Sequence, residues 1–417
     1  MLKTSLCARL REARDLPKML RVNGCCAVLF VALVTAQASA QEEPSSLQVH
    51  GFVSQGYIKT TKNNYLASTA RAQGSFDFTE VGINFTKQLG DKLRVGLQVF
   101  AHDLGPLGNY APQLDWYYLD YRMFDWLGVR AGKTKLPWGL YNEANDVDAG
   151  RVPILLPQSL YSVANRESLF AQTGGELYGD VRLGAAGSLE YRAYGGTIFL
   201  NTAEVSDQFK GFDVPYDAGG RVMWRPPLEG LQLGASAQFL RFDFQFAPTM
   251  DQVAAYQMAG QLPADFSGNV AFKIPIKLWV SSIEYQRERL LLAAEYGRSY
   301  IHYTTNLALP QTKVVNQGGY VMASYQVASW FTPGLYYSAL FPDIHAKPVA
   351  GQDSRSSFQH DVAATLRYDI TSNWLLKLEG HYMHGTAGLN SALNDNKPLN
   401  TLVKDWGVFL VKTTGYF

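Results

Sequence analysis

Apolar and polar residues alternate along most of this chain with a period of two. Successive side chains of a β-strand point to opposite faces, so the alternation predicts strands with one apolar and one polar face. In the stretch 93–103, Leu93 and Val95 fall on one face, and Arg94 and Gln98 fall on the other. Sixteen such stretches follow one another.

The connections between these stretches alternate between short and long. A sheet that spans a bilayer must close on itself, because lipid offers no partner to free backbone groups. Bacterial barrels have an even number of tilted strands, short turns on one side and longer loops on the other. We therefore predict an all-β fold, a transmembrane antiparallel β-barrel of about 16 strands. The short connections are 89–92, 124–126, 184–187, 226–230, 287–289, 328–330 and 371–373, and the long ones fall near 61–75, 104–112, 137–165, 201–218, 247–269, 304–312, 344–357 and 388–402.

Two strands are weakly marked. Pro226 and Pro227 end the eighth abruptly, and Pro275 suggests a bulge or bend in the tenth. Counts of 14 or 18 strands therefore stay open.

The N-terminus is typical of a secretory signal. An apolar core, 25–36, precedes Ala38-Ser39-Ala40, a small-x-small cleavage pattern. We expect a signal peptide at 1–40, a short linker at 41–46 and a single barrel at 47–417. The stretch before the core is long, so Met19 is an alternative start to Met1.

Composition excludes several classes of protein. All three cysteines, Cys7, Cys25 and Cys26, lie in the predicted signal peptide, so the mature chain has no disulfide framework or cysteine metal site. Removing residues 1–40 leaves 31 basic and 34 acidic residues, a net charge near −3. This balance argues against nucleic acid as a partner.

The longest connection, 137–165, has the composition of a loop folded into the barrel. A barrel of about sixteen strands leaves an aqueous channel unless something fills it. The part 152–160 is too apolar for a loop in water. We expect Glu143, Asp146 and Asp148, with Arg151 beside them, to line a constriction; the alternative is a loop that only caps the exterior.

A set of basic residues falls on the polar faces near the short turns. Arginine binds carboxylate and phosphate in a forked geometry, so these residues could form a track for anions. They could equally be structural charges neutralised by Asp120, Asp180, Glu190 and Glu379 on the same faces. The set is Arg94, Arg122, Arg130, Arg182, Arg192, Arg225, Arg367 and Lys377.

Three segments resemble Gram-negative outer-membrane porins: 50–57 (HGFVSQGY), 132–143 (GKTKLPWGLYNE) and the terminal Phe417. The layout is similar to the phosphate-selective porin O and P superfamily and to dicarboxylate-type porins. The resemblance implies a homotrimer, a constricting third loop and recognition of Phe417 by the barrel-assembly machinery. The acidic residues of 137–165 depart from the dense basic constriction of phosphate-selective members, and the helical N-terminal extension of dicarboxylate-type relatives is missing.

We therefore expect a passive diffusion channel for small hydrophilic solutes or ions, embedded in outer-membrane lipid, without catalysis or cofactor. The alternatives are a non-conducting structural barrel and an outer-membrane hydrolase. A hydrolase needs a Ser–His–acid arrangement or a metal site. His381 and His384 are three residues apart on a strand and face opposite sides, so they cannot chelate one ion.

Overall fold

The computed structural model describes residues 46–199, 208–258, 260, 262–266, 268–307, 312–346 and 353–417. One compact unit spans Leu47–Phe417. The predicted signal peptide, 1–40, and the predicted linker apart from Ser46 lie outside the described residues.

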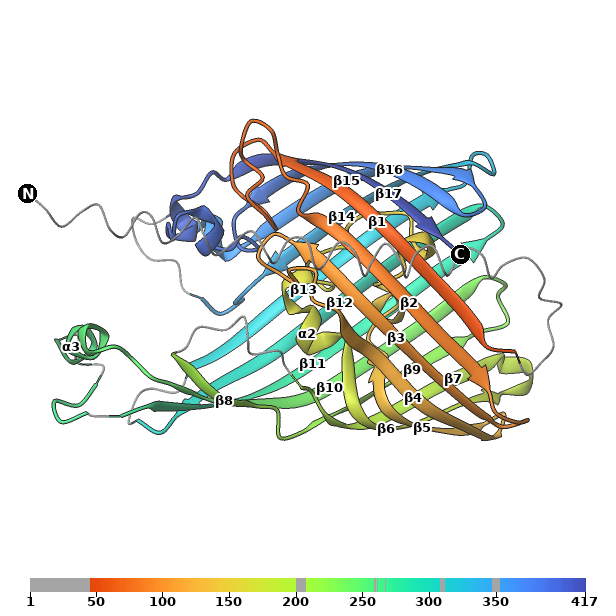
Figure 1. Ribbon diagram of the computed structural model, residues 1–417, viewed down its shortest axis with the longest axis horizontal. Helices are drawn as coiled ribbons and strands as arrows, with labels where there is room; N and C mark the ends of the chain where they lie inside the picture. Colours follow the sequence, from red (N-terminus) through yellow and green to blue (C-terminus); the bar gives the residue numbers. More distant parts are fainter. Residues whose placement is uncertain are drawn as a thin grey trace, which may run out of the picture. The chain divides into compact units, whose positions relative to one another are not determined.

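The unit is built almost entirely from strands (Figure 1). Each strand pairs antiparallel with its neighbours. The strands of the described residues are β1 (Gln48–Thr60), β2 (Phe78–Gln88), β3 (Leu93–Leu104), β4 (Gln113–Phe124), β5 (Leu127–Lys135), β6 (Ala171–Arg182), β7 (Ser188–Thr197), β8 (Phe209–Asp213), β9 (Asp217–Arg225), β10 (Leu231–Phe246), β11 (Val270–Arg287), β12 (Leu290–Thr305), β13 (Thr312–Tyr325), β14 (Phe331–Phe341), β15 (Gln359–Thr371), β16 (Trp374–Gly385) and β17 (Asp405–Tyr416).

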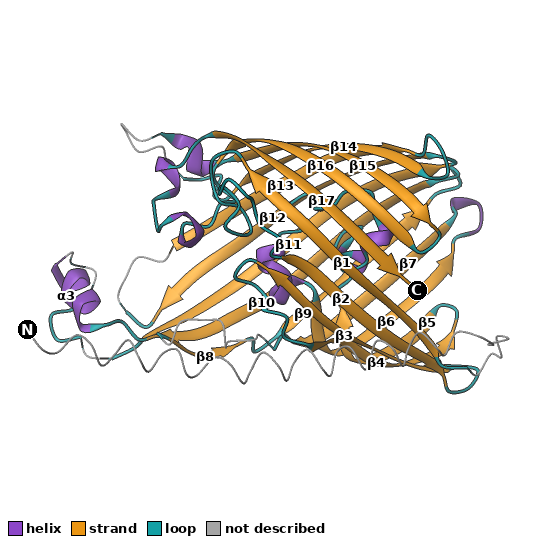
Figure 2. Ribbon diagram, turned by 45° about the horizontal axis from the view of Figure 1, so that its top comes forward, coloured by secondary structure: helices purple, strands orange, loops and turns teal. Residues whose placement is uncertain are grey.

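Short helical segments occur only in the connections of the described chain. The lumen side of the barrel holds four of them, all between β5 and β6 (Figure 2). They are η2 (Asn142–Ala144), η3 (Asp148–Gly150), η4 (Val163–Asn165) and α2 (Arg166–Leu169); the others are η5 (Gly184–Ala186), α3 (Met250–Met258), η7 (Ser354–Ser357), η8 (Ala392–Asn394) and η9 (Leu399–Thr401).

The sheet closes where β1 pairs with β17. Beyond the last strand residue, the Phe417 amide donates to the Gly51 carbonyl at 3.0 Å, and the Gly51 amide donates back at 3.1 Å. Every strand except β8 lies in this ring, which gives the closed barrel of sixteen strands that the sequence predicts. Closure leaves no unpaired edge, as a bilayer requires.

One strand, β8, lies outside this ring and corrects an expectation. It falls inside the segment 201–218, which the sequence predicts to be a loop. It pairs with the outer end of β10, beside β9. Phe212 stacks on Phe244 of β10 at 5.1 Å, and Phe209 packs against Phe246 at 5.3 Å. These aromatic cross-strand contacts stabilise a two-stranded extension of the wall.

Pro275 does not produce the suggested bulge. It lies opposite Arg241 in β10, and the register of β11 with both neighbours is the same on either side of it. The β11–β12 pairs resume at Ile276. Since proline lacks only the N–H donor, the ladder loses one bond and keeps its alignment.

The two faces of the wall differ in chemistry. Large apolar side chains such as Val321, Leu335 and Phe409 are exposed on the outside. Polar and charged side chains such as Lys377, Lys412 and Glu295 are buried inside. Within the described part of the chain, no helix is long and apolar enough to cross a bilayer.

Candidate functional site

The connection between β5 and β6, residues 136–170, runs through the inside of the barrel; we call it the lumen loop (Figure 2). Its middle is fully enclosed, since Ile154, Leu155 and Leu156 are at most 3% exposed. It packs on side chains of the inner wall, such as Met383 and Leu410, and on Tyr65 and Leu389 of the long connections. Inward folding removes an apolar segment from water, as its sequence predicts.

The first acidic anchor of the lumen loop is Glu143, at η2. Arg221 of β9 binds its carboxylate at 2.8 Å, and Arg192 of β7 forms a second ion pair with it. Arg192 also binds the buried Glu176 of β6 at 2.5 Å. Glu143 therefore belongs to a charge network with the wall.

Asp146 and Asp148 are anchored on other parts of the wall. Asp146 accepts hydrogen bonds from Lys135 of β5 and Gln98 of β3, both at 2.6 Å. Asp148 lies 3.0 Å from Lys377 of β16 and accepts a 2.8 Å hydrogen bond from Thr414 of β17. The three acids thus fasten the loop to opposite sides of the barrel.

These three carboxyl groups remain ionised. Burial alone would raise the pKa of each, but the neighbouring cations outweigh burial, so each pKa lies below its ordinary value. For Asp148 the opposing charges are Lys377, Lys412 and Arg151. The three acids are therefore held in place by cations of the wall and of the loop.

Two wall carboxylates hold the backbone of the lumen loop. Glu379 of β16 accepts the amides of Ile154 and Leu155 at 2.7 and 2.9 Å. Glu295 of β12 accepts the Leu140 amide at 3.0 Å and the Tyr161 hydroxyl. These four hydrogen bonds fix the path of the loop, because buried backbone amides and hydroxyl groups need partners.

Sequence reasoning did not single out Glu295. It stands alone in the apolar run LLLAAEYG (290–297), at an inward position of β12. An isolated acid among apolar residues of a strand is the signal that points to it, because an unpaired buried charge is costly.

The basic residues predicted to face the lumen are largely paired. Arg182 is the exception, since no ion pair joins it to another described residue. These distances favour neutralised structural charges over a free anion track. The pairs are Arg94–Asp120 at 2.7 Å, Arg130–Asp120 at 3.4 Å, Arg225–Glu190 at 2.8 Å, Arg122–Asp180 at 3.9 Å, Arg367–Asp369 at 2.8 Å, with Arg192 and Lys377 bound as described.

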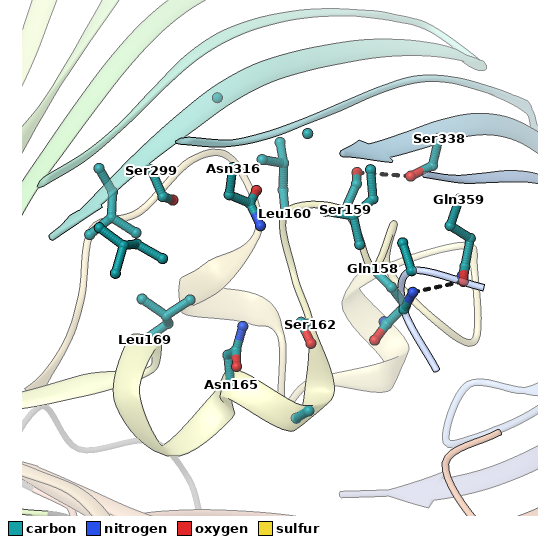
Figure 3. Close-up of a pocket in the computed structure, with 18 of the residues that line it drawn as sticks. Gln158, Ser159, Leu160, Ser162, Asn165, Leu169, Ser299, Asn316, Ser338 and Gln359 are labelled. Carbon is teal, nitrogen blue, oxygen red and sulfur yellow. Dashed lines mark hydrogen bonds between the residues drawn. The ribbon is translucent and has the colours of Figure 1, made fainter. Parts of the chain in front are cut away.

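A cavity of about 600 Å³ lies inside the barrel, on the side of the lumen loop that faces the long connections (Figure 3). Ser159, Ser162 and Asn165 of the loop face Ser299 and Asn316 of the wall across it. Most other lining groups are apolar. The polar part of this outer vestibule consists mainly of hydroxyl and amide groups, and two charged residues, Asp361 and Arg298, also belong to its lining.

A second cavity of about 450 Å³ lies on the short-turn side of the loop. It is lined by charged groups, among them Arg151, Arg367 and Glu284. It has no lining residue in common with the outer vestibule. The lumen loop therefore divides the lumen into an outer and an inner vestibule.

A cavity of about 40 Å³ lies between the loop and the wall of β2 and β3. It shares Gln158 with the outer vestibule, and Arg151 and Leu156 with the inner one. This cavity is the candidate constriction.

Charges of both signs line the candidate constriction. Glu80 of β2 and Asp146 of the lumen loop face it, together with Arg151 and Arg166. Arg166 binds Asp115 at 2.8 Å and lies 4.5 Å from the ring of Phe100. Of the four residues expected at a constriction, Asp146 and Arg151 line this cavity, whereas Glu143 and Asp148 do not.

His381 is held on both sides by buried carboxylates. Both ring nitrogens of His381 contact carboxylates: Nδ1 lies 3.0 Å from Asp361, and Nε2 lies 3.0 Å from Glu379. A general base for a serine nucleophile needs a free ring nitrogen. Among the described residues, no group of three or more His, Cys, Asp or Glu could hold a metal ion.

No protein-family model and no curated protein matches this sequence. Solved structures do resemble it. A variant of OmpT lacking loop L8, an outer membrane protein of Vibrio cholerae, is 12% identical with a TM-score of 0.57, over 90% of this chain and all of that one.

Two porins are similar to the same extent. The anion-selective porin of Comamonas acidovorans is 11% identical with a TM-score of 0.55, over 89% of this chain and 100% of that one. OmpF of Salmonella typhi, in complex with daunomycin, is 14% identical with a TM-score of 0.55, over 90% and 98%. At this identity the likeness shows the fold alone: the chain is an outer-membrane β-barrel.

Proposed function

We propose that the barrel is a passive channel for small hydrophilic solutes or ions, with the lumen loop as its constriction. The observation that carries this proposal is the series of three cavities, of about 600, 40 and 450 Å³, in which the smallest shares lining residues with each vestibule. A solute moves down its gradient, and the space between the loop and β2–β3 sets the size limit.

We further propose weak ionic selectivity. Charged rings in a low-dielectric wall concentrate counter-ions only where their charge is uncompensated. At the candidate constriction Asp146 and Glu80 oppose Arg151 and Arg166. The finer resemblance, to phosphate-selective and dicarboxylate-type porins, would call for an excess of free cations, and the pairing of the lumen arginines argues against it.

The proposed assembly and export follow the resemblance. We propose a homotrimer, removal of residues 1–40 during secretion, and recognition of Phe417 by the barrel-assembly machinery. The ring of Phe417 is 43% exposed at the end of the closing strand, which leaves it accessible to a partner.

One observation favours a second candidate, a non-conducting structural barrel. The lumen loop is bonded to β3, β5, β7, β9, β12, β16 and β17, so it is held around much of the ring. A loop that is fixed on so many sides would also be expected in a barrel whose lumen is permanently closed.

Planar-bilayer recording separates the two candidates. The mature chain should give single-channel current steps at low applied voltage, without any voltage-induced unfolding of the lumen loop. A variant without residues 152–159 should give larger steps. A chain that is folded by circular dichroism but silent, and that conducts only after this deletion, would make the loop a plug and overturn the channel.

A further inference from the structure

The outward face of β10–β13 changes in chemistry along its length. Toward the short turns it carries exposed apolar side chains, among them Ile283, Leu292 and Val321. Further along, the register places Trp279 opposite Arg298, and Lys277 opposite Tyr300. Cations and aromatic side chains therefore replace aliphatic ones at one level of the wall.

An apolar groove of about 500 Å³ lies below this level. Ala294 and Ala323 form its floor, and Leu335 and Tyr337 line its side. A further hollow of about 230 Å³, lined by Tyr296 and Gly319, shares Val321 and Tyr337 with the groove. The groove and the hollow thus form one continuous depression on the lipid-facing surface.

The upper end of the depression is cationic. Arg298 donates a 2.7 Å hydrogen bond to the hydroxyl of Tyr296, a residue that lines the hollow. Within the described residues, no acidic side chain pairs with Lys277 or Arg298. The acid in the neighbouring part of β10, Asp243, is bound by Arg241 at 2.8 Å.

The height of these cations fits a membrane boundary. Arg298 is eight residues beyond Leu290, the first residue of β12. At about 3.3 Å per residue and a tilt of about 45°, this corresponds to roughly 19 Å along the membrane normal. The apolar band of such barrels is about 25 Å tall, so the long side chains of Arg298 and Lys277 reach the headgroups beyond it.

We propose that this face binds a phosphorylated lipid, with an acyl chain in the groove and the phosphate on Arg298 and Lys277. The guanidinium offers a forked pair of donors to phosphate, and the ammonium adds a point charge. Trp279, which packs on Tyr296 at 5.6 Å, supplies the amphipathic surface found at a headgroup boundary. This inference requires the barrel to lie in a membrane but does not require it to conduct.

Native mass spectrometry of the full-length barrel in detergent tests the proposal. Phosphatidylglycerol should bind with saturation, and more tightly than phosphatidylcholine of the same chains. The double variant K277Q/R298Q should lower the affinity for phosphatidylglycerol by roughly tenfold or more, since each cation near a lipid surface contributes measurably. The matched control, K92Q/K397Q, removes two exposed cations elsewhere and should change nothing.

A third variant separates the contribution of the acyl chain to lipid binding from that of the headgroup. A323F fills the groove without changing charge, so it should weaken binding of both lipids. Circular dichroism and heat-dependent mobility on gels report that each variant is folded. Equal binding of the two lipids, an unchanged affinity in K277Q/R298Q, equal competition by inorganic phosphate alone, or dimers formed through the groove in place of lipid binding would each overturn the proposal.

Discussion

The ammonium group of Lys377 lies 3.0 Å from a carboxylate oxygen of Asp148, and both side chains are buried inside the barrel. The two residues are 229 positions apart, one on β16 and one in the lumen loop. A second ammonium, of Lys412 on β17, lies 3.5 Å from the same carboxylate oxygen. The loop is thereby fixed to the two strands that close the barrel.

Asp148→Asn should destabilise the barrel. It leaves the buried ammonium group of Lys377 without a carboxylate, a change that typically costs roughly 3–5 kcal/mol, whereas Lys412 keeps its 2.5 Å ion pair with Glu80. The free energy of unfolding, from denaturant titration in detergent, measures the loss. Asp395→Asn is the matched control, because its pair with Lys397 is exposed and should contribute less than about 1 kcal/mol. Equal losses in the two variants would contradict the anchoring role of Asp148.

Replacing Glu143, Asp146 and Asp148 together by their amides should shift the reversal potential toward anions. The change leaves Lys135 and Lys377 without their carboxylate partners in the lumen. A salt gradient across a planar bilayer gives the reversal potential directly. An unchanged value would remove the lumen loop from the conduction path.

Because Glu143, Asp146 and Asp148 anchor the lumen loop, we expect the stability of the loop to depend on pH only in the acidic range. Their folded-state pKa values lie below the ordinary values, so their contribution to stability is complete above the ordinary carboxyl pKa of about 4 and is lost as pH falls through the lowered folded values. Conductance and current noise should therefore be constant from pH 8 to about 5. Below about pH 4 the loop should loosen, and noise should rise.

A loop released near neutral pH would contradict the assignment of these anchors. The triple amide variant provides the control, because it lacks the titrating groups and should show no acid transition of this kind.

Phe100→Ala should widen the candidate constriction. The ring of Phe100 lines the cavity of about 40 Å³ and supports the guanidinium of Arg166. Removing it should raise single-channel conductance and admit larger neutral solutes, as measured by liposome swelling. Phe409→Ala, on the lipid-facing side of β17, is the control and should leave both quantities unchanged. Matching behaviour of the two variants would exclude this route.

The barrel could be predicted from the sequence because period-two alternation and loop asymmetry are local signals. Each of the seven predicted short connections matches a gap between two consecutive strands to within two residues at either end; 89–92, for example, lies between β2 and β3. The exception is β8. Its five residues do not alternate between apolar and polar, and the strand is stabilised by aromatic contacts with β10, which the local sequence does not reveal.

The candidate site could be predicted from the sequence only in part. The charges of the lumen loop are visible in the sequence, but their partners depend on which strands lie opposite after closure. Glu143 meets Arg192 and Arg221, which lie 49 and 78 positions away. The three acids expected to line a constriction each form ion pairs with the wall, because the tertiary arrangement brings cations to each of them.

The chain also offers a clean chemical probe, since its three cysteines all lie within 1–40. A cysteine introduced at Asn165 faces the outer vestibule, and one introduced at Val362 faces lipid. The most direct measurement is single-channel current of these two variants before and after a charged methanethiosulfonate reagent. We expect current steps in both, and a stepwise block only in Asn165→Cys. Absence of steps in both variants, or equal block in both, would contradict a water-filled lumen enclosed by a lipid-facing wall.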